Sequence, residues 1–146
     1  MASSESERSS GPTSAQRWAA AAHRSIEASG PAGLSEILAD DFVQESHRSG
    51  PITVRREGML GTVRMMKEMG LHVAGEPVAV AGDLHLLTRR RYVHDGDTVE
   101  LLAISEWRDD GCLVRLVEYD ASAYDEALAA LAELSGKPVV RLDRPG

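Results

Sequence analysis

The stretch 84–107, LHLLTRRRYVHDGDTVELLAISEW, decides the fold of this chain. Two runs in which apolar and polar residues alternate, 84–94 and 99–108, flank the tripeptide Asp95-Gly96-Asp97. An Asp-Gly pair between such runs is a strong signal for a β-hairpin, because glycine adopts the positive φ that a tight turn needs. The stretch therefore predicts two neighbouring antiparallel strands.

The same pattern continues on both sides of this hairpin. Runs 71–81 and 113–120 have strand-like composition, and Gly82-Asp83 and 109–111 supply the turns between runs. Four consecutive strands joined by short turns predict an antiparallel meander.

Helical periodicity dominates the region before the meander. A first helix is expected from Ser14 to about Ala28, a short second helix over 32–39 that ends at Asp40-Asp41, and a third over 55–69. Between the second and third helices, 42–48 is predicted to be a strand.

The C-terminal region predicts one more helix, over 123–134, which is followed by a glycine. The Ser- and Glu-rich segment 1–11 predicts a disordered tail, and 12–136 predicts a single domain. For the C-terminal tail, 137–146, two outcomes stay open: it pairs as a short edge strand, or it stays loose. This order of elements predicts an α+β fold in which a strongly curved, cone-shaped antiparallel sheet wraps around the N-terminal helices and leaves a ligand cavity.

Composition excludes several functions. The net charge of −7 argues against binding to nucleic acid or to an anionic membrane, both of which attract basic surfaces. The histidines show no metal-ligand spacing and no Gly-rich phosphate loop is present, so we expect neither a metal nor a cofactor. With one cysteine, Cys112, no apolar signal segment and no apolar run long enough to span a membrane, we expect a cytoplasmic protein.

Two segments, ILADDFVQESHRSG at 37–50 and VRLVEYDASAYDEALAALAEL at 114–134, resemble the nuclear transport factor 2-like superfamily, and more narrowly its SnoaL-like branch of polyketide cyclases and ketosteroid isomerases. The resemblance implies a cystatin-like α+β roll with an extra C-terminal helix, and a homodimer formed through the outer face of the sheet. It does not fix the reaction, because this fold hosts isomerases, cyclases, dehydratases, epoxide hydrolases and non-catalytic binders. The position of the isomerase's general base is occupied by Ser46 in this chain.

The strand 42–48 carries the first candidate site residues. Gln44, Ser46 and Arg48 share one face, which the resemblance turns toward the cavity, and His47 lies on the other face unless a bulge shifts the register. His47 is the first catalytic candidate because an imidazole titrates near neutral pH; the alternative is an edge histidine satisfied by a neighbour. Arg48 either binds an anionic group or forms a structural salt bridge.

The meander carries the second catalytic candidate, Glu106. The strand face that contains Ser105 and Trp107 is the more apolar, which turns Glu106 outward; if a bulge reverses the faces, Glu106 becomes an acid or base in the cavity. One arginine of the run 89–91 that points into the cavity would favour a carboxylate, enolate or phosphate, and Arg91 is the one placed in the ligand-binding set; the alternative is that these arginines pair with glutamates on neighbouring strands, Glu100, Glu106 and Glu118.

Four apolar or aromatic residues complete the predicted ligand-binding set, and each has a structural alternative as core filling or as an interface aromatic: Trp18, Met59, Met66 and Tyr119. The leading hypothesis is a cofactor-independent acid–base enzyme that acts on an apolar or polycyclic small molecule. The rival is a non-catalytic ligand-binding or dimerisation module of the same fold.

Overall fold

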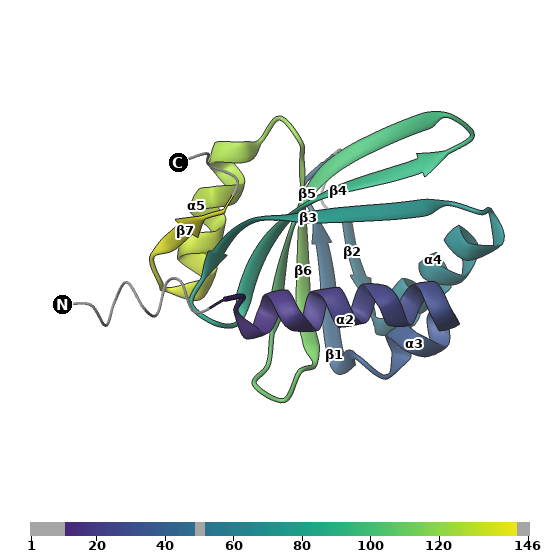
Figure 1. The fold of residues 1–146 in the computed structure, drawn as a ribbon, viewed down its shortest axis with the longest axis horizontal. Helices are drawn as coiled ribbons and strands as arrows, with labels where there is room; N and C mark the ends of the chain where they lie inside the picture. The colour runs from purple at the N-terminus through teal and green to yellow at the C-terminus, as the bar shows by residue number, and fades with distance from the viewer. Residues whose placement is uncertain (1–10, 49–51, 143–146) are drawn as a thin grey trace.

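A computed structural model describes residues 11–48 and 52–142 of the chain. The predicted α+β class is confirmed: a curved, seven-stranded sheet packs against three helices on one face and one helix on the other (Figure 1). Most of the predicted N-terminal tail, together with the predicted break at 49–51, lies outside the described residues.

The strands run in the order β2-β1-β6-β5-β4-β3-β7 across the sheet. Their bounds are β1 Leu38–Ser46, β2 Ile52–Arg55, β3 His72–Ala81, β4 His85–His94, β5 Asp97–Trp107, β6 Leu113–Asp120 and β7 Val139–Arg141. The helices are α2 Ser14–Ser29, α3 Pro31–Ser35, α4 Arg56–Glu68 and α5 Tyr124–Ser135.

The predicted meander β3-β4-β5-β6 is confirmed, and its central hairpin turns at Asp95 and Gly96. Both residues have positive φ, 51° and 84°, as the Asp-Gly signal predicts for a tight turn. In this hairpin Arg90 faces Leu101 and Tyr92 faces Val99.

The prediction that Asp40-Asp41 end a helix is wrong. Helix α3 stops at Ser35, and β1 already begins at Leu38, which pairs with Leu113 and is buried. A short apolar run fits a helix and a buried strand equally well, so periodicity alone does not separate the two. The short strand β2 was not predicted, and the parallel pairing of β1 with β6 makes the sheet mixed rather than purely antiparallel.

Helices pack against both faces of the sheet, which we call inner and outer. The inner face packs against α2, α3 and α4, with Phe42 and Trp107 in its core. The outer face packs against α5, whose fully buried Leu131 lies against a cluster that includes Leu102 and Ile104. Strand β5 therefore shows consecutive buried residues instead of alternation.

Helix α2 is fixed at its N-terminus by contacts that position it over the inner face. Thr13 and Gln16 form a capping box, and the Ser14 amide donates to Oδ1 of Asp83 at 2.9 Å. The hydrogen bonding with Ser14 lowers the pKa of the Asp83 carboxyl below its ordinary value.

Near the C-terminus, β7 pairs with β3. The C-terminal tail therefore forms a short edge strand over residues 139–141, which is the first of the two outcomes expected for it.

Candidate ligand-binding cavity

A large cavity lies between the inner face of the sheet and helices α2 and α4. Its volume is about 1000 Å³, at the upper end of the range found for small-molecule sites. Much of the wall is apolar, with Met59, Val63 and Met66 contributed by α4 and Leu86 and Leu101 by the sheet. The cavity is large enough for a polycyclic molecule.

Trp107 forms one part of the cavity wall and is held by contacts with Ser105 and Trp18. The Trp107 indole donates to the Ser105 hydroxyl at 2.9 Å, and this hydroxyl lies 3.5 Å from the Leu86 carbonyl oxygen. Trp18 packs its ring against Trp107 with 6.0 Å between centroids. The bond to Ser105 satisfies the buried indole N–H, so this wall keeps a fixed shape.

Three polar side chains line the cavity from the inner face, where β1 runs beside β6. Gln44 pairs with Leu116 and Ser46 pairs with Glu118, which sets Glu118 on the same face as Gln44 and Arg48. Glu118 is only 9 % exposed, and no hydrogen bond or ion pair joins its carboxylate to another described residue. The Arg48 Nε lies 3.5 Å from Oδ1 of Asp120 but forms no hydrogen bond within the described part of the chain.

A second polar group follows β4 along the inner face. Thr88, Arg90 and Tyr92 all line the cavity. They lie across β5 from the group around Glu118, so polar side chains border the apolar part of the cavity on two sides.

The predicted inward face of the strand 42–48 is the face that lines the cavity. Of the predicted ligand-binding residues, Gln44, Arg48, Met59 and Met66 are in its wall. Ser46 shares this face but is not in the wall; its hydroxyl accepts from the Arg48 amide at 3.4 Å. The remaining predicted site residues are not part of the wall: Trp18, which packs against Trp107, and His47, Arg91, Glu106 and Tyr119.

His47 lies on the outer face of the sheet and not in the cavity. Its ring stacks on Tyr119, with 4.9 Å between centroids and 5° between planes, and the side chain is exposed. Tyr119 also points outward, because it follows Glu118 on the strand. Burial, and to a lesser extent the charges of Glu126 and Glu45, raise the pKa of the Tyr119 hydroxyl.

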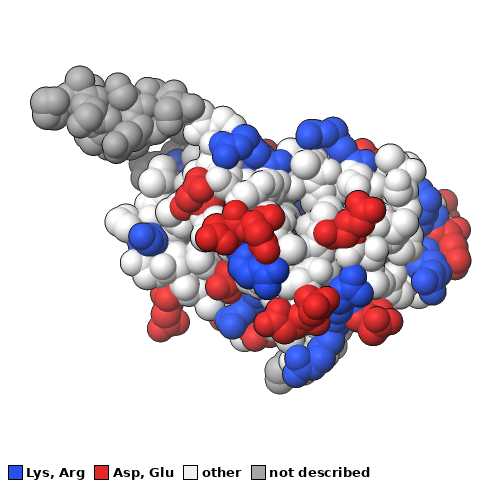
Figure 2. Space-filling model, turned by 90° about the horizontal axis from the view of Figure 1, so that it is seen from below, with Lys and Arg blue, Asp and Glu red and all other residues white. Residues whose placement is uncertain are grey.

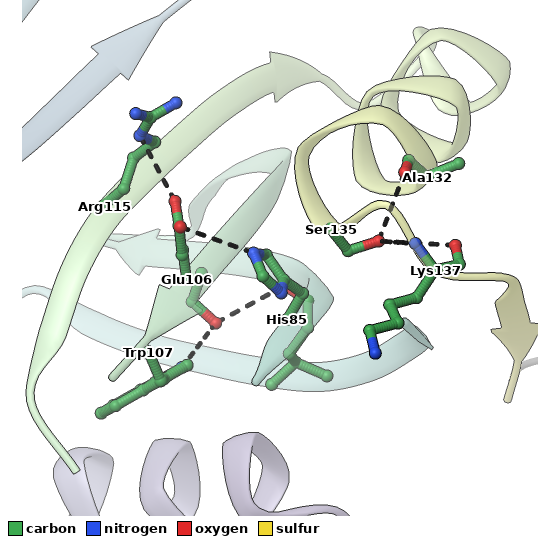
Figure 3. A network of polar contacts seen from close by, with 9 residues as sticks. His85, Glu106, Trp107, Arg115, Ala132, Ser135 and Lys137 are labelled. Atoms are coloured by element: carbon green, nitrogen blue, oxygen red, sulfur yellow. Dashed lines mark hydrogen bonds and ion pairs between the residues drawn. The ribbon is translucent and has the colours of Figure 1, made fainter. Parts of the chain in front are cut away.

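Glu106 and Arg91 are also outward, since they lie on the outward-pointing positions of β5 and β4. Figure 3 shows Glu106 between Arg115 and His85 and pointing away from Trp107; its oxygens lie 3.4 Å from the Arg115 Nε and 3.6 Å from the His85 Nε2. Arg91 donates twice to Oε2 of Glu100, at 3.0 and 2.9 Å. Glu106 therefore points outward and Arg91 pairs with a glutamate on a neighbouring strand, which are the structural alternatives stated for these two residues.

Glu118 and Arg90 were missed as site candidates. Glu118 was expected only as a cross-strand ion-pair partner of the arginines, and Arg91 was chosen in place of Arg90. A signal was present for Glu118, because it shares a strand face with the apolar Leu116. For Arg90 the signal was the alternation within 84–94, which separates it from Arg89 and Arg91.

Within residues 11–48 and 52–142, no group of three or more His, Cys, Asp or Glu side chains is arranged to hold a metal ion. None of the helices in these ranges is long and apolar enough to cross a bilayer.

No protein-family model matches the sequence, and no curated protein matches it. Solved structures do match. An LEH-like epoxide hydrolase of Mycobacterium tuberculosis is 21 % identical with a TM-score of 0.57, over 88 % of this chain and 98 % of that one. The RV0760c protein of the same organism, in complex with estradiol-17β-hemisuccinate, is 16 % identical with a TM-score of 0.57, over 73 % and 92 % of the two chains.

A computationally designed 17-OHP binder is 13 % identical with a TM-score of 0.62, over 92 % of this chain and 100 % of that one. These similarities show that the chain shares the fold of these structures, which also include a protein with a ketosteroid isomerase-like fold and one with a cystatin fold. The fold resemblance noted in the sequence is confirmed, and the reaction has to be argued from the cavity itself.

Proposed function

We propose that this protein binds an apolar or polycyclic small molecule in the inner cavity and acts on it as a cofactor-independent acid–base enzyme. Glu118 is the proposed proton-transferring group. The observation that carries the proposal is the position of this carboxylate in a largely apolar cavity, unengaged by any other described side chain. Its oxygens are free to take a proton from a bound molecule.

Gln44 and Arg48 supply the second requirement of such chemistry. When a base removes a proton from the carbon next to a carbonyl, negative charge develops on the carbonyl oxygen. The Gln44 amide and the Arg48 guanidinium share the inner face with Glu118 and are proposed to donate hydrogen bonds to that oxygen. Glu118 then returns the proton at another atom, which completes an isomerisation and is also a step of cyclisation or dehydration.

Epoxide opening is a variant that the same groups support. In it the Arg48 guanidinium donates a hydrogen bond to the epoxide oxygen, and Glu118 takes a proton from the water that attacks one epoxide carbon. The carbon–oxygen bond that breaks leaves an alkoxide, to which Glu118 then returns the proton. The similarity to an LEH-like epoxide hydrolase supports this variant, and that to a protein in complex with estradiol-17β-hemisuccinate supports a polycyclic ligand. The designed 17-OHP binder supports the alternative of a non-catalytic binding protein.

The experiment separates these possibilities by isotope uptake. A panel of apolar cyclic ketones is incubated with the protein in D₂O, and a panel of apolar epoxides in H₂¹⁸O, and products are read by mass spectrometry. We expect uptake into at least one compound, and a loss of about 10²–10⁴-fold in Glu118→Gln. Glu106→Gln, the same change on the outer face, is the matched control and should keep the wild-type rate.

Two results would count against the proposal. Binding of panel compounds without isotope uptake would rule out the proposed enzyme activity and support the non-catalytic binding protein. Equal loss of isotope uptake in Glu118→Gln and Glu106→Gln would show that Glu118 is not the proton-transferring group.

We also propose a homodimer, formed through the part of the outer face that α5 leaves uncovered. His47, stacked on Tyr119, is exposed in this part. Sedimentation equilibrium should give twice the chain mass, and His47→Glu, which places a second acid near Glu45, should shift the protein toward the monomer. A monomeric mass for the wild type would contradict the proposal.

A further inference from the structure

Three consecutive arginines on β4 have different surroundings. Arg89 and Arg91 point to the outer face, where each faces a glutamate on a neighbouring strand: Glu76 for Arg89 and Glu100 for Arg91. The corresponding nitrogen–oxygen distances are 3.9 Å and 2.9 Å. Both outer arginines are therefore accounted for by ion pairs within the sheet.

Arg90 points to the inner face and has no such partner among the residues that the structure describes. On the neighbouring strands it faces Gly75 and Leu101, neither of which carries a charge. The next inner-face positions on these strands are equally apolar: Val73, Pro77, Val99 and Ala103. Within the described chain, no carboxylate oxygen lies within 4.0 Å of an Arg90 nitrogen, so this cavity-lining guanidinium keeps its donors free.

The cavity also differs in charge from the rest of the molecule. On the face shown in Figure 2, acidic and basic side chains are interspersed, and the whole chain has a net charge of −7. The residues that line the cavity have the opposite balance: four are basic, Arg24, Arg48, Lys67 and Arg90, and two are acidic, Glu27 and Glu118. Arg24, Lys67 and Glu27 are exposed, and Arg48 lies near Asp120, so among the described residues Arg90 is the unpaired basic group within the cavity. A concave site with low-dielectric walls concentrates the field of such groups, so it attracts anions.

We propose that the ligand of this cavity is an apolar molecule that carries one acidic group, and that Arg90 binds this group. A guanidinium binds a carboxylate through two parallel hydrogen bonds, which orients as well as holds it. With the carboxylate on Arg90, the apolar body extends along Leu101 and Leu86 toward Met59. This inference rests on the proposed function, because it names the class of molecule that the same cavity takes.

Two fluorescent probes test the inference because they differ in a single anionic group. N-phenyl-1-naphthylamine is neutral, and 8-anilinonaphthalene-1-sulfonate is the same molecule with a sulfonate, which stands in for the carboxylate. Both are titrated into the wild type, Arg90→Gln and Arg91→Gln, the last being a matched control on the opposite face of the same strand. Arg90→Met serves as a second variant if Arg90→Gln folds poorly, as judged by circular dichroism.

We expect Arg90→Gln to weaken binding of the sulfonate probe about tenfold or more, as for loss of a charge-assisted hydrogen bond, and to change binding of the neutral probe less than about twofold. Arg91→Gln should leave both affinities unchanged. Equal weakening of both probes, or no weakening of the sulfonate probe, would overturn the role of Arg90 while leaving the cavity as a binding site. Failure of the wild type to bind either probe would overturn the proposed function together with this inference.

Discussion

Replacing Leu131 by Ala tests whether the outer core holds α5 on the sheet. Leu131 is 0 % exposed and lies in the cluster that joins α5 to the outer face. The change deletes three carbons, worth about 2.4 kcal/mol at about 0.8 kcal/mol per buried CH₂. The space left behind raises the loss in the free energy of unfolding to about 3–4 kcal/mol.

This loss is a large part of the total stability of a domain, which is about 5–15 kcal/mol. We therefore expect Tm to fall by roughly 10 °C, measured by differential scanning calorimetry, and the urea midpoint to fall with an unchanged slope. Leu142→Ala is the matched control: the same change at a side chain that is 40 % exposed should cost less than about 1 kcal/mol.

The same variant also tests the separation of the two faces. Since Leu131 lies across the sheet from the cavity, the neutral probe N-phenyl-1-naphthylamine should bind folded Leu131→Ala within about twofold of the wild-type affinity. The reasoning is refuted if Leu131→Ala is as stable as Leu142→Ala, because α5 would then not be held by this core.

Three further changes test other parts of the account. Asp83→Asn should lower the free energy of unfolding by up to about 1 kcal/mol at neutral pH, because a carboxylate stabilises the N-terminus of α2 through Ser14. The pKa of Asp83 is lowered in the folded state, so the difference in free energy of unfolding between the wild type and Asp83→Asn should be constant above the ordinary carboxyl pKa. It should shrink as the pH falls below that value, and urea titrations between neutral and acidic pH would measure this change. Gly33→Ala should destabilise by about 1–3 kcal/mol in the same assay, because a Cβ there would overlap the Ser25 carbonyl. Thr88→Trp should block part of the cavity and weaken binding of both fluorescent probes at least tenfold with little change in Tm; unchanged probe affinities would place their binding elsewhere.

The strand turns and the meander were predictable because their signals are local. Asp95 and Gly96 determine the turn type by themselves, and each turn residue then aligns the strands around it. The start of β1 was not predictable in the same way. Leu38 becomes a strand residue through its pairing with Leu113, which lies far along the chain, and no local pattern carries that information.

The part of the cavity wall that β1 supplies was predictable, but the part that β6 supplies was not. Alternation correctly grouped Gln44 with Arg48 and separated them from His47, so the facing of this strand followed from sequence and resemblance. Chemical preference for an imidazole base then favoured His47, although its face is the outer one. Glu118 emerged only when the register of β1 against β6 set it beside Gln44 and Arg48.

The methionines of α4 are the best probes of whether an apolar molecule binds in the inner cavity. Met59 and Met66 line the cavity, whereas Met65, on the same helix, does not line it and is 53 % exposed. We would label the methionine methyl groups with ¹³C and follow their NMR signals while N-phenyl-1-naphthylamine is added to the full chain. We expect the Met59 and Met66 signals to shift together and saturate while the Met65 signal stays in place. Saturable binding that shifts Met65 and leaves Met59 and Met66 unmoved, or no shift of any of the three, would contradict binding in the inner cavity.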